Sequence, residues 1–158
     1  MKPHIERTRR GFRLRLSDDE RAVLRALPRQ LRELLGSGDP STVRLFPPAY
    51  RDDPERQAEF RALMEDDLLT QKREALDVME ATLDAERLDE EQLTAWLGAL
   101  NDLRLVLGTR LGVTEEAETS DPSAAEDPAQ VLYHFLGWLE EQAVEALAAG
   151  LDPRGTER

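Results

Sequence analysis

The segment that most constrains the fold runs from residue 89 to residue 112, where apolar side chains recur at the spacing of one helix face. The apolar positions are Leu93, Trp96, Leu97, Leu100, Leu103, Leu107 and Leu111. Steps of three and four residues place these side chains along one side of an α-helix, which must bury that side against other elements. Asp89 and Gln92 form an N-terminal capping signal, and Gly112 ends the pattern.

A second helix is predicted over residues 17–35. Ser17 and Glu20 have the spacing of a capping box, and acidic residues in the first turn suit the positive end of the helix dipole. Pro28 cannot donate a backbone hydrogen bond, so we expect a kink or a split there. Gly36 and Gly38 are expected to stop the helix.

Two further helices are predicted to start at proline, a residue whose fixed φ angle suits the first helical position. The helix from Pro54 is long enough to form the spine of a bundle, and its apolar positions are Phe60, Leu63, Met64, Leu68, Leu76, Met79 and Leu83. The helix from Pro128 ends at Gly150, and its apolar positions are Val131, Leu132, Phe135, Leu136, Leu139, Val144 and Leu147.

The N-terminal segment is predicted to form a small β arm. Apolar residues alternate with Arg13 and Arg15, a period of two that is typical of a half-buried strand, and a turn at Arg10 and Gly11 would let residues 5–9 pair back. The expected fold is mainly α, a bundle of about four helices with a small N-terminal β-hairpin. We expect a β arm at 1–16, a helical bundle domain at 17–150 with a flexible acidic linker at 113–126, and a frayed tail at 151–158.

Nothing in the sequence predicts catalysis, a metal site or a cofactor. The chain has no cysteine, its histidines His4 and His134 have no ligand partners at metal spacing, and His4 is expected in a frayed tail. The carboxylates Glu65, Asp66 and Asp67 fan around a helix, so a solvated face is favoured over an acid–base pair. No apolar stretch is long enough for a membrane span and no secretory segment opens the chain, so we expect a cytoplasmic protein.

Charge is distributed unevenly. The chain carries a net charge of −12, yet residues 1–35 hold ten basic and five acidic groups, which leaves −17 for the remainder. Only this N-terminal part could attract nucleic acid, and its candidate phosphate contacts are Arg7, Arg9, Arg10, Arg13 and Arg15. The alternative is that these arginines protect an exposed strand edge from aggregation.

Arg104 lies between Leu100 and Leu107 on the apolar side of its predicted helix. A charged group on that side needs a partner when it is buried. We therefore expect an interhelical ion pair between Arg104 and a carboxylate of the long helix that starts at Pro54.

Three segments resemble a known family: LFPPAYRDDP at 45–54, ALNDLRLVLGTRLG at 99–112 and LGWL at 136–139. They are similar to an actinobacterial family of unknown function, DUF2017-like, which includes an oxidative-stress regulator. The likeness runs from about Phe12 to Leu147, and the middle segment is the most specific of the three.

The resemblance implies a non-enzymatic regulator of transcription under oxidative stress. Its implied partner is a protein, a stress sigma factor or RNA polymerase, and the acidic balance of the chain suits a basic protein surface. The candidate contact residues are Phe46, Pro47, Tyr50, Arg51, Asn101, Asp102, Arg104 and Arg110. Redox sensing in that family is attributed to a cysteine pair, which this chain lacks, so an oxidant-sensing role does not carry over.

Alternatives stay open at the level of sequence. The proline-rich loop could simply cover the bundle, and Asn101 and Asp102 could be structural hydrogen-bonding groups. Direct DNA binding by the arginine arm and a purely structural homodimer are the competing functions. A dimer is suggested because Trp96, Trp138 and Tyr133 add a large apolar area for a small bundle to bury.

Overall fold

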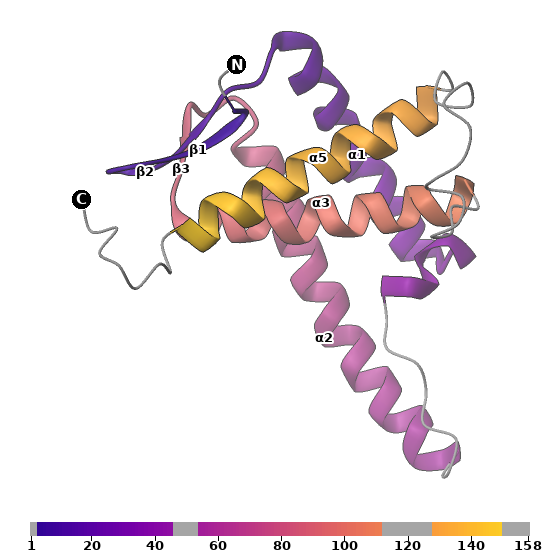
Figure 1. Ribbon diagram of the computed structural model, residues 1–158. Coiled ribbons are helices and arrows are strands. Elements are labelled where there is room, and N and C mark those ends of the chain that lie inside the picture. Colours follow the sequence, from indigo (N-terminus) through magenta and orange to yellow (C-terminus); the bar gives the residue numbers. More distant parts are fainter. Residues whose placement is uncertain (1–2, 46–53, 112–127, 150–158) are drawn as a thin grey trace.

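The computed structural model describes residues 3–45, 54–111 and 128–149, which form four long α-helices and a small sheet (Figure 1). The elements are β1 (Ile5–Thr8), β2 (Gly11–Leu14), α1 (Asp18–Ser37), the 3₁₀ helix η1 (Pro40–Leu45), α2 (Pro54–Ala81), β3 (Arg87–Leu88), α3 (Glu90–Leu111) and α5 (Pro128–Ala149). The predicted mainly α fold with an N-terminal hairpin is confirmed. The linker expected at 113–126, the frayed tail at 151–158 and the stops at Gly112 and Gly150 lie outside the described residues.

Helix α3 is the centre of the bundle. It packs against α5, α2, η1, α1 and the sheet, and its residues Leu93, Trp96 and Leu100 are fully buried. The Trp96 indole Nε1 donates a hydrogen bond to Thr82 Oγ1 at 2.7 Å, which satisfies its one polar atom inside the core. The expectation that the helix from Pro54 forms the spine is therefore wrong.

The buried side chains that the structure describes on α2 lie in its second half. Leu76 and Met79 are buried, whereas Leu63 is 72% exposed although it belongs to the predicted apolar stripe. Figure 1 shows the first half of α2 extending beyond the other helices. The side chains of Phe60 and Met64 lie outside the described part. Spacing alone could not reveal where along the helix the packing stops.

Helix α1 has the predicted start and an unbroken course. Ser17 Oγ accepts from the Glu20 backbone N–H, and the Glu20 carboxylate accepts from the Ser17 backbone N–H at 2.8 Å. The sequence predicted a kink or a split at Pro28, and no split occurs: α1 continues through Pro28, whose ring is buried in the core. The helix ends at Gly38, which adopts a left-handed conformation with φ of 66°.

The β arm is part of the hydrophobic core. β1 pairs antiparallel with β2, with Ile5 opposite Leu14 and Arg7 opposite Phe12, and Ile5, Phe12 and Leu14 are buried. The short β3, which the sequence did not predict, pairs with the other edge of β2. The Gln142 side chain of α5 accepts hydrogen bonds from the backbone N–H groups of His4 and Ile5. His4 is therefore held in place, and the prediction that it lies in a frayed tail is wrong.

Helix α5 buries one side against α3 and the sheet. Leu136 and Leu139 are buried as predicted, but Val131 is 53% and Val144 47% exposed. Trp138 is also 41% exposed, whereas Trp96 is fully buried and cannot contribute to an interface.

In the described part of the chain, no helix is long and apolar enough to cross a membrane.

Candidate partner-binding site

Helix α3 carries two ion pairs that link it to its helical neighbours. Lys72 Nζ of α2 lies 3.1 and 3.2 Å from the two carboxylate oxygens of Asp102, and Arg104 Nε lies 2.9 Å from Glu140 Oε1 of α5. The second contact is an ion pair without the alignment of a hydrogen bond. Positions 102 and 104 are two residues apart on a helix, so their side chains leave α3 in nearly opposite directions.

Both carboxylates are poorly solvated. Burial raises the pKa of Asp102 above its ordinary value, although the Lys72 ammonium opposes this by favouring the charged form. Burial likewise raises the pKa of Glu140. Arg104 lowers this pKa by favouring the charged carboxylate, and the negative charge of Asp102 raises it further. Each carboxylate therefore depends on its cation to remain charged in the fold.

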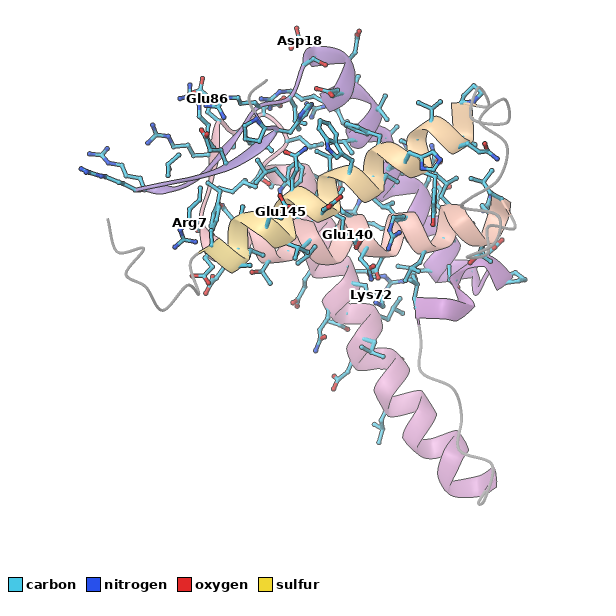
Figure 2. The ribbon with its side chains drawn as sticks, in the orientation of Figure 1. Arg7, Asp18, Lys72, Glu86, Glu140 and Glu145 are labelled. Atoms are coloured by element: carbon cyan, nitrogen blue, oxygen red, sulfur yellow. The ribbon has the colours of Figure 1, made fainter. Side chains whose placement is uncertain are left out.

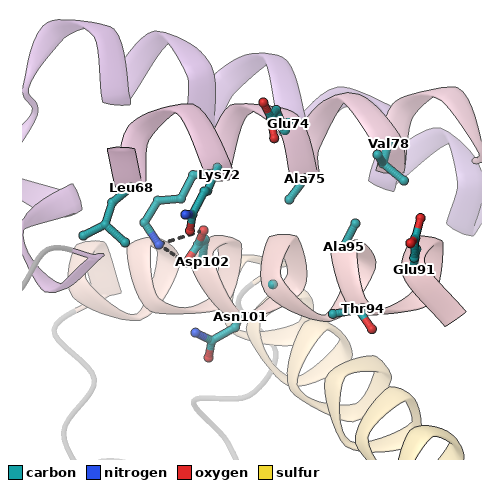
Figure 3. A pocket seen from close by; sticks show the side chains of 12 residues that line it. Leu68, Lys72, Glu74, Ala75, Val78, Glu91, Thr94, Ala95, Asn101 and Asp102 are labelled. Carbon is teal, nitrogen blue, oxygen red and sulfur yellow. Dashed lines mark hydrogen bonds and ion pairs between the residues drawn. The ribbon is translucent and has the colours of Figure 1, made fainter. Parts of the chain in front are cut away.

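An open groove of about 530 Å³ runs between α2 and α3 beside the Lys72–Asp102 pair (Figure 3). Its lining combines polar groups from both helices with a small apolar floor: Leu68, Gln71, Lys72, Glu74, Ala75, Val78, Glu91, Thr94, Ala95, Gly98, Asn101 and Asp102. A Cβ added at Gly98 would meet nothing within 4 Å, so there is open space at this position of the groove. The ion pair supplies a fixed charged wall, and Asn101 supplies amide donors and acceptors.

Of the predicted partner-binding residues that the structure describes, two line this groove. Asn101 and Asp102 line it, whereas Arg104 faces α5 and Arg110 faces η1. Phe46, Pro47, Tyr50 and Arg51 lie outside the described residues. Lys72, Gly98 and the α2 side of the groove were not predicted as site residues. The sequence signal that could have pointed to Lys72 is its residue type, because the chain has no other lysine apart from Lys2.

The prediction that Arg104 pairs with the long helix is wrong, because its partner is Glu140 on α5. A Cβ at Gly137 would lie 3.3 Å from Arg104 Cδ, so the absence of a side chain at Gly137 makes room for the arginine. At Gly108 a Cβ would lie 2.9 Å from Tyr133 Cε1. The second and third resemblance segments thus supply the close approach of α3 and α5, which is a structural role.

Arg110 ties the end of α3 to η1. Its guanidinium lies 3.7 Å from Asp39 Oδ2, and its Nε is 3.5 Å from Ser41 Oγ. Hydrogen bonds from the Ser41 hydroxyl and backbone N–H lower the pKa of Asp39, and Arg110 contributes in the same direction. These contacts link the end of α3 to η1 and the residue before it, and the Arg110 side chain is 52% exposed.

The N-terminal arginines divide between two faces of the sheet. Arg7 lies on the core side, where its guanidinium is 5.3 Å from the centre of the Phe12 ring and near the Ala146 carbonyl at the end of α5 (Figure 2). Arg13 and Arg15 lie on the outer side, and Arg15 pairs with Glu6 at 2.9 Å. Arg9 and Arg10 are exposed at the hairpin turn.

Arg87 joins this outer face from β3. Its Cα is opposite that of Arg13 in the register of the sheet. Like charges directly opposite each other on neighbouring strands are destabilising. An anion bound beside Arg13 and Arg87 would reduce the repulsion between them. Sequence reasoning missed Arg87 because a two-residue strand has no readable periodicity.

The acidic cluster on α2 offers no acid–base pair in the described part of the structure. Asp66 and Asp67 are exposed, and the side chain of Glu65 lies outside the described residues. Among the described residues, no three histidine or carboxylate groups lie close enough to hold a metal ion.

Comparison with known proteins links the chain to one family. A family model described as a domain of unknown function, DUF2017, matches residues 1–147. The oxidative stress regulator AosR of Mycobacterium tuberculosis (strain H37Rv) and that of Mycobacterium bovis are each 33% identical to the chain over 131 residues. The alignment covers 70% of this chain and 59% of each relative, so the chain spans less than two thirds of their length. No solved structure gives a significant match.

Proposed function

The chain belongs to the DUF2017 family, and from this membership we propose that it is a non-enzymatic regulator of the oxidative-stress response that acts by binding another protein. The observation that carries the proposal is its 33% identity to relatives named as oxidative stress regulators. The proposed partner is a sigma factor or a subunit of RNA polymerase. Because the chain has no cysteine, the proposed regulation uses no thiol of this chain.

The groove between α2 and α3 supports this proposal as the partner contact. It holds a fixed charge pair, a half-buried amide at Asn101 and an unfilled position at Gly98, a combination that suits an extended or helical protein segment. The net charge of −17 on residues 36–158 would also attract a basic partner surface and speed its association.

A pull-down with the tagged chain tests the proposal. The lysate comes from an oxidatively stressed actinobacterial culture and is treated with nuclease, so that bridging DNA is removed. We expect mass spectrometry of the bound fraction to identify a sigma factor or polymerase subunits. Recovery of the bait alone would contradict the proposal.

The arginine face of the sheet supports a second candidate function, the binding of a nucleic-acid backbone. The specific observation is Arg87 opposite Arg13, which concentrates positive charge on a protein that is otherwise strongly acidic. We expect duplex DNA to bind with an affinity that falls steeply with salt and that decreases severalfold in Arg87→Ala. Arg29→Ala, which removes an exposed helical arginine, is the matched control and should bind as the unmodified chain does. Fluorescence anisotropy of labelled duplex measures both, and no binding even at low salt would eliminate this function.

A further inference from the structure

A second groove, separate from the one described above, is lined by residues near the start of α1 and the start of α5. It has a volume of about 570 Å³, and its lining residues are Asp19, Glu20, Val23, Pro128, Val131, Leu132 and Phe135. Val23 and Val131 are 43% and 53% exposed on opposite sides of the groove. Large apolar side chains facing each other across an open groove are typical of a binding surface.

The apolar surface continues along α5 beyond the groove. Val131, Phe135 and Trp138 follow at intervals of four and three residues, so they form one stripe on the helix. Trp138 contacts the His4 ring with a centroid distance of 4.5 Å, and His4 Nε2 lies 2.8 Å from Glu20 Oε2. These contacts fix the side chains beside the groove, so that little ordering is needed when a partner binds.

The rim at the start of α1 is acidic. Asp18 and Asp19 are exposed there, and Asp18 projects from the tip of the helix in Figure 2. Glu20 is held by the Ser17 backbone N–H and by His4, which lower its pKa although partial burial opposes this, so the third carboxylate stays charged near neutral pH. Asp19 and Glu20 line the groove and Asp18 directly precedes them, so an occupant with basic side chains is favoured.

We infer that this groove binds an amphipathic helix of a partner protein, whose apolar side chains enter between Val23 and Val131 and whose basic side chains face Asp18 and Asp19. A second copy of this chain does not fit, because it would bring the same acidic turn and a net charge of −12 to the contact. An anionic membrane surface is repelled for the same reason. This inference goes beyond the proposed function and does not depend on the groove between α2 and α3.

Two synthetic helical peptides test the charge requirement. Both carry leucines at alternating steps of three and four residues, and one has lysines on the flanks of this stripe where the other has glutamates. Fluorescence anisotropy with the full chain measures both affinities. We expect the lysine peptide to bind at least about tenfold more tightly than the glutamate peptide. Equal affinities, or no binding of the lysine peptide, would overturn the inference.

A pair of variants on one helix tests the location. Val131→Glu places a carboxylate in the groove, whereas Val144→Glu makes the same change at a similarly exposed position of α5 outside it. Both sites are well exposed, so we expect both variants to fold, which circular dichroism checks. Val131→Glu should weaken binding of the lysine peptide by about tenfold or more, and Val144→Glu by less than about twofold.

Other outcomes separate this inference from the proposed function. An equal effect of the two variants on peptide binding would show that the peptide does not bind in this groove. The stress-regulator proposal would not be affected, because the pull-down tests it separately. Sedimentation of the unmodified chain would reveal a concentration-dependent dimer, and a dimer that Val131→Glu abolishes would assign the groove to a second copy and overturn the inference.

Discussion

Lys72→Met is expected to lower the free energy of unfolding by about 3 to 5 kcal/mol at pH 7. Lys72 Nζ is the cation beside Asp102, whose side chain is 8% exposed. Removing one partner of a buried ion pair leaves the other charge without compensation, which costs more than the pair contributed. Urea unfolding followed by circular dichroism measures the change.

The same variant should show a distinctive pH dependence. Burial already raises the pKa of Asp102, and the loss of Lys72 removes the main influence that opposes this. An acid whose pKa is raised in the folded state binds more protons in the folded than in the unfolded state, so stability falls as pH rises from the ordinary pKa toward the raised one. The destabilisation by Lys72→Met should therefore be large at pH 7 and clearly smaller at pH 4, where Asp102 takes up a proton.

Arg25→Met is the matched control for Lys72→Met. Arg25 pairs with Asp84 at 2.7 Å, but both side chains are more than half exposed. An exposed pair contributes about 0 to 1 kcal/mol, because water screens the charges. A loss in Lys72→Met as small as that in Arg25→Met, or equal losses at pH 7 and pH 4, would show that the Lys72–Asp102 pair is not buried as described.

Gly11→Ala is expected to destabilise the protein by about 3 kcal/mol or more. Gly11 has a φ of 129°, a conformation that L side chains rarely adopt, and strain of this kind costs about 1 to 3 kcal/mol. An added Cβ would also lie 2.5 Å from the Leu88 carbonyl oxygen, which is a rigid backbone atom. The contact would force β3 away from β2 and disturb the core around Phe12 and Leu88.

Gly98→Ala is expected to change the free energy of unfolding in the opposite direction, measured by the same urea unfolding. Gly98 is exposed within α3, and an added Cβ would meet nothing within 4 Å. Alanine in the middle of a helix is more stable than glycine by about 0.5 to 1 kcal/mol, so this variant should be slightly stabilised. A Gly11→Ala protein as stable as the unmodified chain would contradict the described approach of Gly11 to Leu88.

Local signals in the sequence predicted much of the helical fold. The capping residues Ser17 and Glu20 act through backbone groups within one turn, so their spacing alone identified the start of α1. Pro54 and Pro128 marked helix starts for the same local reason. The apolar stripe of α3 predicted a packed helix, and Leu93, Trp96 and Leu100 are fully buried.

Features that depend on distant contacts could not be predicted. β3 exists because residues 87–88 meet the free edge of β2, which no periodicity in two residues can indicate. The continuity of α1 through Pro28 depends on the core that covers the proline. The partner of Arg104 could not be chosen from sequence either, because the spacing placed Arg104 on a packed face without saying whether α2 or α5 covered it.

The candidate site was likewise predictable only in part. Asn101 and Asp102 were identified and do line the groove, but the groove itself arises from the crossing of α2 and α3 and from the missing side chain at Gly98. The acidic rim and the exposed valines between α1 and α5 come from segments more than 100 residues apart in the chain. Their proximity is a property of the fold alone.

The proposed function places a protein partner in the groove between α2 and α3. The most direct test compares Gly98→Phe with Gly36→Phe in the nuclease-treated pull-down from oxidatively stressed cells. Both positions are exposed helical glycines, where an added Cβ would meet nothing closer than 3.8 Å, but only Gly98 lines the groove. We expect Gly98→Phe to lose the sigma factor or polymerase partner and Gly36→Phe to retain it. Equal recovery of the partner by both variants would rule out the groove as its binding site.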